Sequence, residues 1–264
     1  LKNGSAHTTV NDIDNGSTDT TWDLVRDLSQ RDPRIIPFEQ THLPYNDALR
    51  ARVYNQVHQE LDEDDWWMIL DSDEFMAENP KELIEKANRD AADIIRSWII
   101  QFYFTEKDLA EWEGERDSRD KPIFERRRHY LINWQESRLF RNQRGPAWDV
   151  AINSNVPNGL KRVWRRRILN RHYQFRDPEQ IEKRLQLRFG HPMFHAHVKS
   201  ADWRASIMDS RKLNYHRDGE PWQFRLSGIM YYYRKKFIYM LRGKYHGAIR
   251  RLRHALLADQ EKRG

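Results

Sequence analysis

Short apolar runs alternate with amphipathic stretches along the first two thirds of the chain. Runs of strand character lie at residues 10–13, 34–38, 66–70, 92–105, 138–141 and 161–173. Apolar residues with helical spacing lie at residues 20–28, 45–61, 80–88 and 178–189. Strands that alternate with helices in this way predict an α/β fold.

Local start signals support two of these helices. Asp177 comes just before Pro178, which suits an N-cap followed by proline in the first turn. Ser17 or Asp19 is the expected cap of the helix over residues 20–28. Residues 106–130 are dense in charge, so we expect an exposed loop or lid there.

Carboxylates follow two of the predicted strands. The strand at 66–70, which we expect to be buried, continues into Asp71 and Asp73, and the strand at 10–13 continues into Asp14 and Asn15. An open α/β sheet binds its ligands outside the carboxyl ends of its strands, and carboxylate oxygens suit a divalent cation that holds a diphosphate. Each segment by itself is also compatible with an ordinary solvated turn.

The two segments resemble the nucleotide-sugar-binding half of the family 2 glycosyltransferases, which carries a D-D/N-G-S-x-D turn and then a D-x-D metal motif. This chain has Asp14-Asn15-Gly16-Ser17-Thr18-Asp19 and Asp71-Ser72-Asp73 in that order. A later segment, from His172-Tyr173 through Arg176 to Glu179-Gln180, resembles the H-Y-x-x-R-x-x-E-Q motif of a bacterial branch. The resemblance implies a GT-A fold, in which helices flank a Rossmann-like mixed sheet.

The resemblance also implies roles for single residues. Asp73, Asp71 and His172 would hold Mn²⁺ or Mg²⁺, while Asp14, Asn15, Asp71 and Arg176 would contact the nucleotide sugar. A lone histidine is more often structural, and a second histidine cluster at His191, His195 and His197 competes with His172 for a metal role. Hard cations bound to phosphate prefer oxygen ligands, which argues against that cluster.

An inverting transfer needs a general base, and the sequence does not single one out. Asp149 and Glu136 lie between the metal motif and His172, where the resemblance places such a group. Related chains often carry His-Glu near Asn153-Ser154, and this chain does not. We therefore favour Asp149 slightly, since Glu136 could instead pair with Arg138.

Only 13 residues precede Asp14, whereas the family places a strand and a helix before this turn. The sequence therefore raises the expectation that a first strand-helix unit is missing or replaced near the N-terminus. Residues 1–190 are predicted to form the catalytic domain, and residues 191–264 a helical extension.

The extension is where the basic charge lies. The chain has a net charge of +6, but residues 221–258 contain nine Lys or Arg and no Asp or Glu. Large apolar and aromatic side chains are interleaved with these charges, as in helices that lie on anionic membranes. A helix pair that covers the catalytic domain or forms a dimer explains the pattern equally well.

The composition excludes some kinds of metal site, cross-link and membrane segment. The chain has no cysteine, which excludes disulfides and thiolate metal sites, and no apolar run long enough to span a membrane. No nucleic-acid-binding motif accompanies the basic segment, so we expect no nucleic-acid partner. Cytoplasmic location, with peripheral contact at the inner face of the membrane, is the expectation.

The predicted activity is metal-dependent transfer of a sugar from a nucleoside diphosphate sugar to a hydroxyl of a glycan or lipid-linked acceptor, in the synthesis of a surface polysaccharide or glycoconjugate. Two other classes use the same features. A phosphodiesterase or nuclease also clusters carboxylates around a metal. A noncatalytic binding module would keep the sheet and lose the base.

Overall fold

The computed structural model describes residues 8–42, 48–145, 147–149, 155–189, 200–238 and 240. The chain divides into two compact units. The first unit comprises residues 1–69, 87–95 and 137–164, and the second comprises residues 70–86, 96–136 and 165–264.

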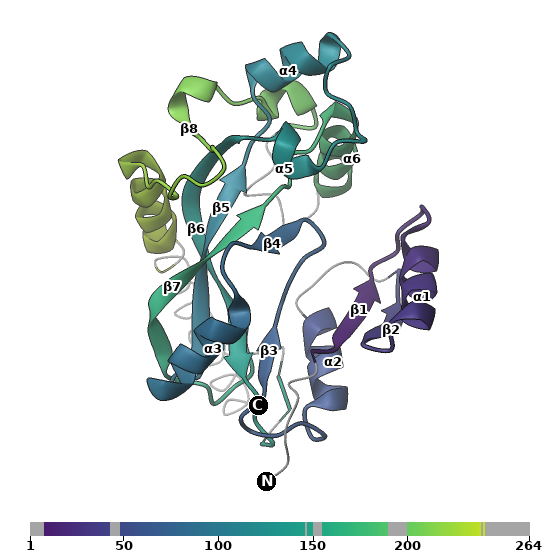
Figure 1. Ribbon diagram of the computed structural model, residues 1–264, viewed down its shortest axis with the longest axis vertical. Coiled ribbons are helices and arrows are strands. Elements are labelled where there is room, and N and C mark those ends of the chain that lie inside the picture. Colours follow the sequence, from purple (N-terminus) through teal and green to yellow (C-terminus); the bar gives the residue numbers. More distant parts are fainter. Residues whose placement is uncertain are drawn as a thin grey trace, which may run out of the picture. The chain divides into compact units, whose positions relative to one another are not determined.

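Strands and helices alternate as the sequence predicts (Figure 1). The strands are β1 (Val10–Asp14), β2 (Ile35–Gln40), β3 (Trp66–Met68), β4 (Glu74–Met76), β5 (Ile94–Phe102), β6 (His129–Arg141), β7 (Val163–His172) and β8 (Asn214–Tyr215). The helices are α1 (Thr21–Arg31), α2 (Ala48–Val57), α3 (Pro80–Arg89), α4 (Glu106–Glu113), α5 (Ile123–Arg126) and α6 (Pro178–Arg188). Residues 226–238 are also helical.

The strand pairing is mixed. β1 and β2 form a parallel pair, and the other strands follow the order β3-β6-β5-β7-β4, with β8 added to β6. β3 and β4 pair antiparallel with β6 and β7 respectively. The predicted α/β fold with a mixed sheet and flanking helices is confirmed.

The helix starts agree closely with the local signals. Asp177 is the N-cap of α6, and its side chain accepts a hydrogen bond from the backbone N–H of Gln180. Asp19 accepts from the backbone N–H and the hydroxyl of Thr21 at the start of α1, although the cap position itself is Thr20.

Two expectations about strands need correction. The run at 66–70 forms only the short β3, and Met68 and Leu70 are exposed, so this strand is not buried. The chain turns between Asp71 and Glu74 and re-enters the sheet as β4. The short strand expected at 138–141 is the end of β6, which is 13 residues long.

The expectation of an exposed loop at residues 106–130 is right about exposure over most of residues 106–126 and wrong about the loop, because two helices lie there. α4 begins with a capping box in which Thr105 and Asp108 exchange hydrogen bonds, and α5 follows. Arg126 and Arg127 both pair with Asp117, at 2.7 and 2.5 Å, and all three side chains are buried. These three side chains pair with one another away from solvent, whereas most other charged residues of the segment are exposed.

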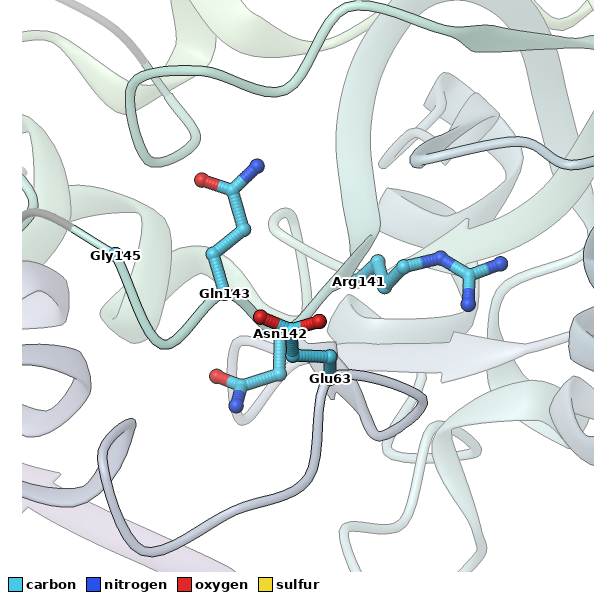
Figure 2. A pocket seen from close by; sticks show the side chains of 5 residues that line it. All are labelled: Glu63, Arg141, Asn142, Gln143 and Gly145. Atoms are coloured by element: carbon cyan, nitrogen blue, oxygen red, sulfur yellow. The ribbon is translucent and has the colours of Figure 1, made fainter.

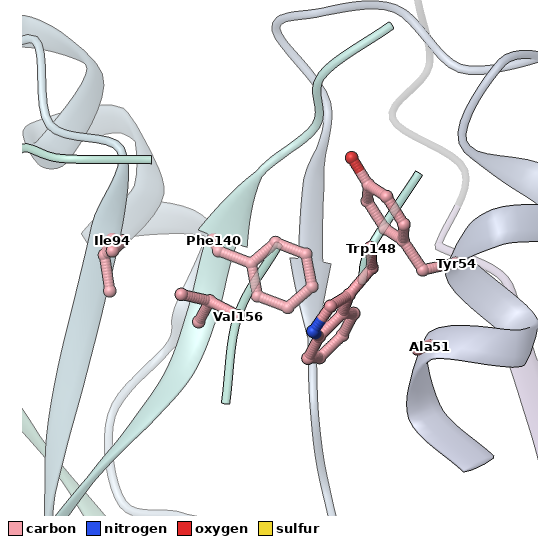
Figure 3. Packing of buried hydrophobic residues seen from close by; sticks show 6 residues of the cluster. All are labelled: Ala51, Tyr54, Ile94, Phe140, Trp148 and Val156. Carbon is pink, nitrogen blue, oxygen red and sulfur yellow. The ribbon is translucent and has the colours of Figure 1, made fainter. Parts of the chain in front are cut away.

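An aromatic cluster forms the core of the first unit (Figure 3). Tyr54 of α2 and Phe140 of β6 pack against Trp148, with ring centroids about 6 Å apart in edge-to-face geometry. The side chain of Asn55 exchanges hydrogen bonds with the backbone of Trp148. Truncation of a buried tryptophan costs about 3–5 kcal/mol, so this cluster is a main support of the unit.

The second unit has its own core on β5, β6 and β7. Phe102 and Tyr173 stack at 4.3 Å between ring centroids, and Tyr130 packs against Phe102. Because Tyr173 directly follows His172, this stack holds the end of β7 in place. In Figure 1, α4, α5 and α6 lie together beyond the carboxyl end of β5.

Several predicted features lie outside the described residues. The start of the helix at 45–61, the histidines at 191, 195 and 197, and residues 241–264 belong to this group. The domain boundary at residue 190 stays a prediction.

Candidate functional site

The first part of the site is the turn that follows β1. Asp14 is buried, and its carboxylate accepts hydrogen bonds from the backbone N–H of Ser17 at 3.0 Å and from Nε2 of Gln40 at 2.9 Å. Its backbone oxygen accepts from the N–H of Thr41. Both oxygens of the carboxylate therefore hold the turn together.

Burial alone would raise the pKa of Asp14, but the hydrogen bonds from Ser17 and Gln40 outweigh it and lower the pKa below its ordinary value. The amide of Asn15 lies 3.5 Å from the carbonyl oxygen of Thr41. Gly16 has a φ of +79°, and a Cβ there would lie 2.9 Å from Nδ1 of His42. The turn thus needs glycine for both its conformation and its space.

The second part of the site is Asp73, which lies between β3 and β4 in the second unit. Its Oδ1 is 3.3 Å from Nε2 of His172, and its Oδ2 accepts a hydrogen bond from Nη1 of Arg184 at 3.3 Å. The three side chains are only 17–18% exposed. The backbone oxygen of Asp73 accepts from the N–H of Tyr173, so the turn is tied to β7 as well.

Positive charge dominates the electrostatics at Asp73. Burial would raise its pKa, but the hydrogen bond and charge of His172 and the charges of Arg184 and Arg176 hold the pKa well below the ordinary range. For Arg184, burial and then the charge of Arg188 lower the pKa to about 10. Asp73 is therefore a carboxylate kept ionised at any pH near neutrality.

The segment after β7 builds the turn that brings α6 to Asp73. The side chain of Gln180 accepts from the backbone N–H of Arg176, and Arg119 pairs with both Asp177 and Glu179. The buried Arg127 donates to the carbonyl oxygen of Arg176. These contacts fix the first turn of α6, and Arg184 lies on the next turns of the same helix.

Comparison with known proteins identifies the family of the chain. A model of one family, glycosyl transferase family 2, matches residues 10–169, which is well over half of the chain and runs from β1 through most of β7. The chain belongs to glycosyl transferase family 2. No curated protein and no solved structure matches it. Membership implies a nucleotide-sugar donor and an acceptor for this glycosyltransferase.

The residues predicted to bind the nucleotide sugar or the metal are divided between the two units. Asp14 and Asn15 belong to the first unit, whereas Asp71, Asp73, His172 and Arg176 belong to the second. Among the second group, the structure brings His172 against Asp73 and places the charge of Arg176 close enough to lower the pKa of Asp73. The backbone N–H of Asp71 donates to the buried carboxylate of Glu74.

The residues near Asp73 fit a metal that shares its coordination with a substrate. In the described part of the chain, no three His, Asp or Glu side chains converge as a complete ligand set. Mg²⁺ is commonly held by one or two carboxylates together with substrate phosphates, and Asp73 offers one such carboxylate, with His172 beside it. Because Arg184 lies at the same carboxylate, a cation bound there would share Asp73 with its guanidinium.

The two candidate bases lie in different units. Glu136 is on β6 in the second unit, and its Oε1 accepts a hydrogen bond from the indole N–H of Trp134 at 3.1 Å. Asp149 is exposed in the first unit and follows the buried Trp148, whose backbone is held by Asn55. The positions of Asn153 and Ser154 lie outside the described residues.

Sequence reasoning missed Arg184 and Gln174. Nη2 of Arg184 donates to Oε1 of Gln174 at 2.7 Å, which orients the guanidinium that reaches Asp73. Arg184 is 111 residues from Asp73 in the sequence. The one available signal is its position four residues after Gln180, one helical turn beyond the last motif residue.

A pocket in the first unit is lined by Glu63, Arg141, Asn142, Gln143 and Gly145 (Figure 2). The amide nitrogen of Asn142 donates to three backbone oxygens between residues 58 and 62, and its amide oxygen accepts from the indole N–H of Trp67. Arg141 pairs with Asp64. These side chains hold the connection between α2 and β3, which explains their presence without a ligand.

A search of the described helices for a membrane span found none that is long and apolar enough to cross a bilayer.

Proposed function

We propose that the chain transfers a sugar from a nucleoside diphosphate sugar to a hydroxyl of a glycan or lipid-linked acceptor, with inversion at the anomeric carbon and with Mn²⁺ or Mg²⁺. The proposal places the reaction in the synthesis of a surface polysaccharide or glycoconjugate, close to the bacterial branch that the third motif resembles. The observation that carries it is the position of Asp73, a D-x-D carboxylate kept ionised by His172 and Arg184.

Asp73, with His172 and Asp71, would hold the cation at the diphosphate, and such a cation stabilises the charge that develops on the leaving group. Arg184 and Arg176 add positive charge beside Asp73. A diphosphate that enters this region gains those charges as partners, and arginine is well suited to phosphate because it presents a planar fork of donors. Binding of the diphosphate would thereby orient the donor.

Asp14 and Asn15 are proposed to line the nucleoside end of the donor. Both oxygens of the Asp14 carboxylate are already hydrogen-bonded, so its first contribution is to keep the turn in one shape. A preorganised turn lowers the entropic cost of binding a nucleoside. Asp14 is in this respect a positioning residue.

The base accepts the proton of the acceptor hydroxyl while the hydroxyl oxygen forms its bond to the anomeric carbon and the bond to the diphosphate breaks. Asp149 is our first candidate and Glu136 the second. Glu136 is already oriented by the indole of Trp134, whereas Asp149 is exposed. We also propose that the chain is cytoplasmic, and that its C-terminal segment makes a peripheral contact with the membrane where a lipid-linked acceptor would lie.

The first test is isothermal titration with a panel of nucleoside diphosphates and their sugars, in Mn²⁺ and in chelator. We expect one nucleotide to bind in Mn²⁺ and to lose affinity in chelator. Asp73→Asn should weaken that binding by about 100-fold, because it removes the charge that the cation needs. Asp23→Asn, an equal change at an exposed carboxylate on α1, is the matched control.

Failure of every nucleotide to bind the folded native chain would overturn the donor site. Equal affinity in Mn²⁺ and chelator would overturn the metal. If the bound donor is hydrolysed at the same rate with and without candidate acceptors, a phosphohydrolase replaces the transferase.

A further inference from the structure

The helix over residues 226–238 packs on the second unit through one narrow face. A Cβ on Gly228 would lie 2.4 Å from the carbonyl oxygen of Ile132, so the helix backbone directly touches β6. Tyr232, one turn later, is buried, and its ring contacts Trp98 and Trp134 with centroids 5.1 and 6.1 Å away. Figure 1 shows this helix, in olive, beside the sheet.

The opposite face carries a stripe of large apolar side chains in water. Its members are Leu226, Met230, Tyr233, Phe237 and Met240, which are 71, 62, 58, 56 and 49% exposed. Their spacing of four, three, four and three residues places them within an arc of roughly 80° on a helix. Gly228 and Tyr232 lie on the other side of the helix axis, so the stripe faces away from β5 and β6.

Positive charge borders the stripe. Arg234 and Lys236 are exposed and lie about 80° to either side of its centre. No Asp or Glu occurs anywhere from residue 221 to residue 258, whereas nine Lys or Arg do. An apolar strip with cations on both borders is the pattern of a helix that lies in the plane of a membrane surface.

Charge decides between a bilayer and a second copy of the chain as the occupant. Two such stripes packed together would bring the Arg234 and Lys236 borders of one copy against those of the other, with no acidic residue in the segment to compensate. Anionic headgroups provide the opposite charge at the depth where the borders would lie, while the acyl boundary accepts the apolar side chains.

We propose that this helix is a membrane-binding surface that lies on a bilayer containing anionic lipid, with its five-residue stripe at the boundary between headgroups and acyl chains. The inference deepens the peripheral membrane contact of the proposed function. It rests on the part of the proposed function that places the chain at a membrane, and it does not depend on sugar transfer. A lipid-linked acceptor would then be met at the surface where its head group lies.

The test is co-sedimentation of the full chain with extruded vesicles, made of phosphatidylcholine alone or mixed with phosphatidylglycerol, without donor or metal. We expect binding to the mixed vesicles and a loss of binding as salt rises. The double variant Met230→Glu/Phe237→Glu should bind about tenfold more weakly or worse, because it places two carboxylates in the stripe. Arg234→Gln/Lys236→Gln should also weaken binding by about tenfold or more, since each cation contributes separately.

Leu24→Glu is the matched control, because it makes the same kind of change at another exposed apolar position, on α1. It should bind as the native chain does. Circular dichroism melting of each variant checks the fold, and the Arg234→Gln/Lys236→Gln variant keeps the test valid if the Met230→Glu/Phe237→Glu variant is unfolded.

Native binding that is equal on neutral and anionic vesicles, or unchanged in the folded variants, would overturn the proposal. A native chain that ignores vesicles and instead dimerises in sedimentation velocity, with dimers lost in Met230→Glu/Phe237→Glu, would assign the stripe to a second copy. A native chain that neither binds vesicles nor dimerises would also overturn the proposal. None of these outcomes depends on donor titration, so a failure of the transferase proposal is recognised separately.

Discussion

Asp14 is the last residue of β1 and Asp73 lies in the turn between β3 and β4, and both carboxylates have a pKa below the ordinary value, but for different reasons. Asp14 is held by neutral donors, the N–H of Ser17 and the amide of Gln40. Asp73 is held by His172 and the guanidinium of Arg184. The carboxylate of Asp14 holds its turn in shape, and the carboxylate of Asp73 balances the positive charge of its neighbours.

The difference indicates what each region can do. Neutral hydrogen bonds leave the negative charge of Asp14 in place while they use both of its oxygens, so that turn is a rigid part of the protein. The partners of Asp73 are side chains that carry or can carry positive charge, and in the proposed function a metal and a diphosphate would join them. The region around Asp73 is thus suited to binding a charged ligand reversibly.

The largest effect should come from removing one partner of each carboxylate. Arg184→Met leaves Asp73 without its guanidinium in a site that is only 17% exposed, and we expect the free energy of unfolding to fall by about 2 kcal/mol. The pKa of Asp73 should rise. Urea denaturation gives the first quantity, and carboxyl NMR gives the second.

Gln40→Leu is the matched change at Asp14. It removes one neutral hydrogen bond, and we expect a loss of about 1 kcal/mol. An equal loss in the two variants, with no change in the pKa of Asp73, would mean that the carboxylates are held in the same way and would end the comparison.

A pair of glycine substitutions should separate the cost of backbone strain from the cost of close packing at the Asp14 turn. Gly16→Ala forces alanine into a φ of +79° and places its Cβ 2.9 Å from Nδ1 of His42, so the free energy of unfolding should fall by about 1–2 kcal/mol. Gly219 has nearly the same φ, +81°, but a Cβ there would have nothing within 4 Å, so Gly219→Ala tests backbone strain alone. Its loss should stay near 1 kcal/mol. Thermal melts of both variants check this, and a larger loss at Gly219 would show that the packing argument is mistaken.

The last expected effect is confined to acid pH and concerns the fall in stability there. Because the folded pKa values of Asp14 and Asp73 are lowered, their stabilisation is complete above the unfolded value of about 3.9 and is lost as pH falls through the folded values. Asp14→Asn and Asp73→Asn should each flatten the fall in stability below about pH 4, with Asp73→Asn the flatter because its partners are charged. Denaturation curves from pH 2 to pH 7 measure it, and curves parallel to the native one would contradict it.

Much of the fold was predictable because its signals are local. The periods of the apolar positions gave α1, α3, α6 and most strands, and the Asp177-Pro178 pair marked the start of α6 to the residue. The error at residues 106–130 was to infer a loop from a high density of charge, because α4 and α5 lie there. Composition cannot tell a solvated charge from one that is paired, and Asp117 with Arg126 and Arg127 is paired and buried.

For the candidate site, the sequence by itself determined which carboxylates lie at the ends of which strands, and a resemblance to a family motif added residues 172–180. It did so because turns, caps and strand ends are set by neighbouring residues. Only the tertiary structure decided that Arg184 reaches Asp73 across 111 residues of sequence, and that the apolar stripe beginning at Leu226 faces away from β6. Such contacts depend on how distant segments pack, and no local pattern of side chains specifies that packing.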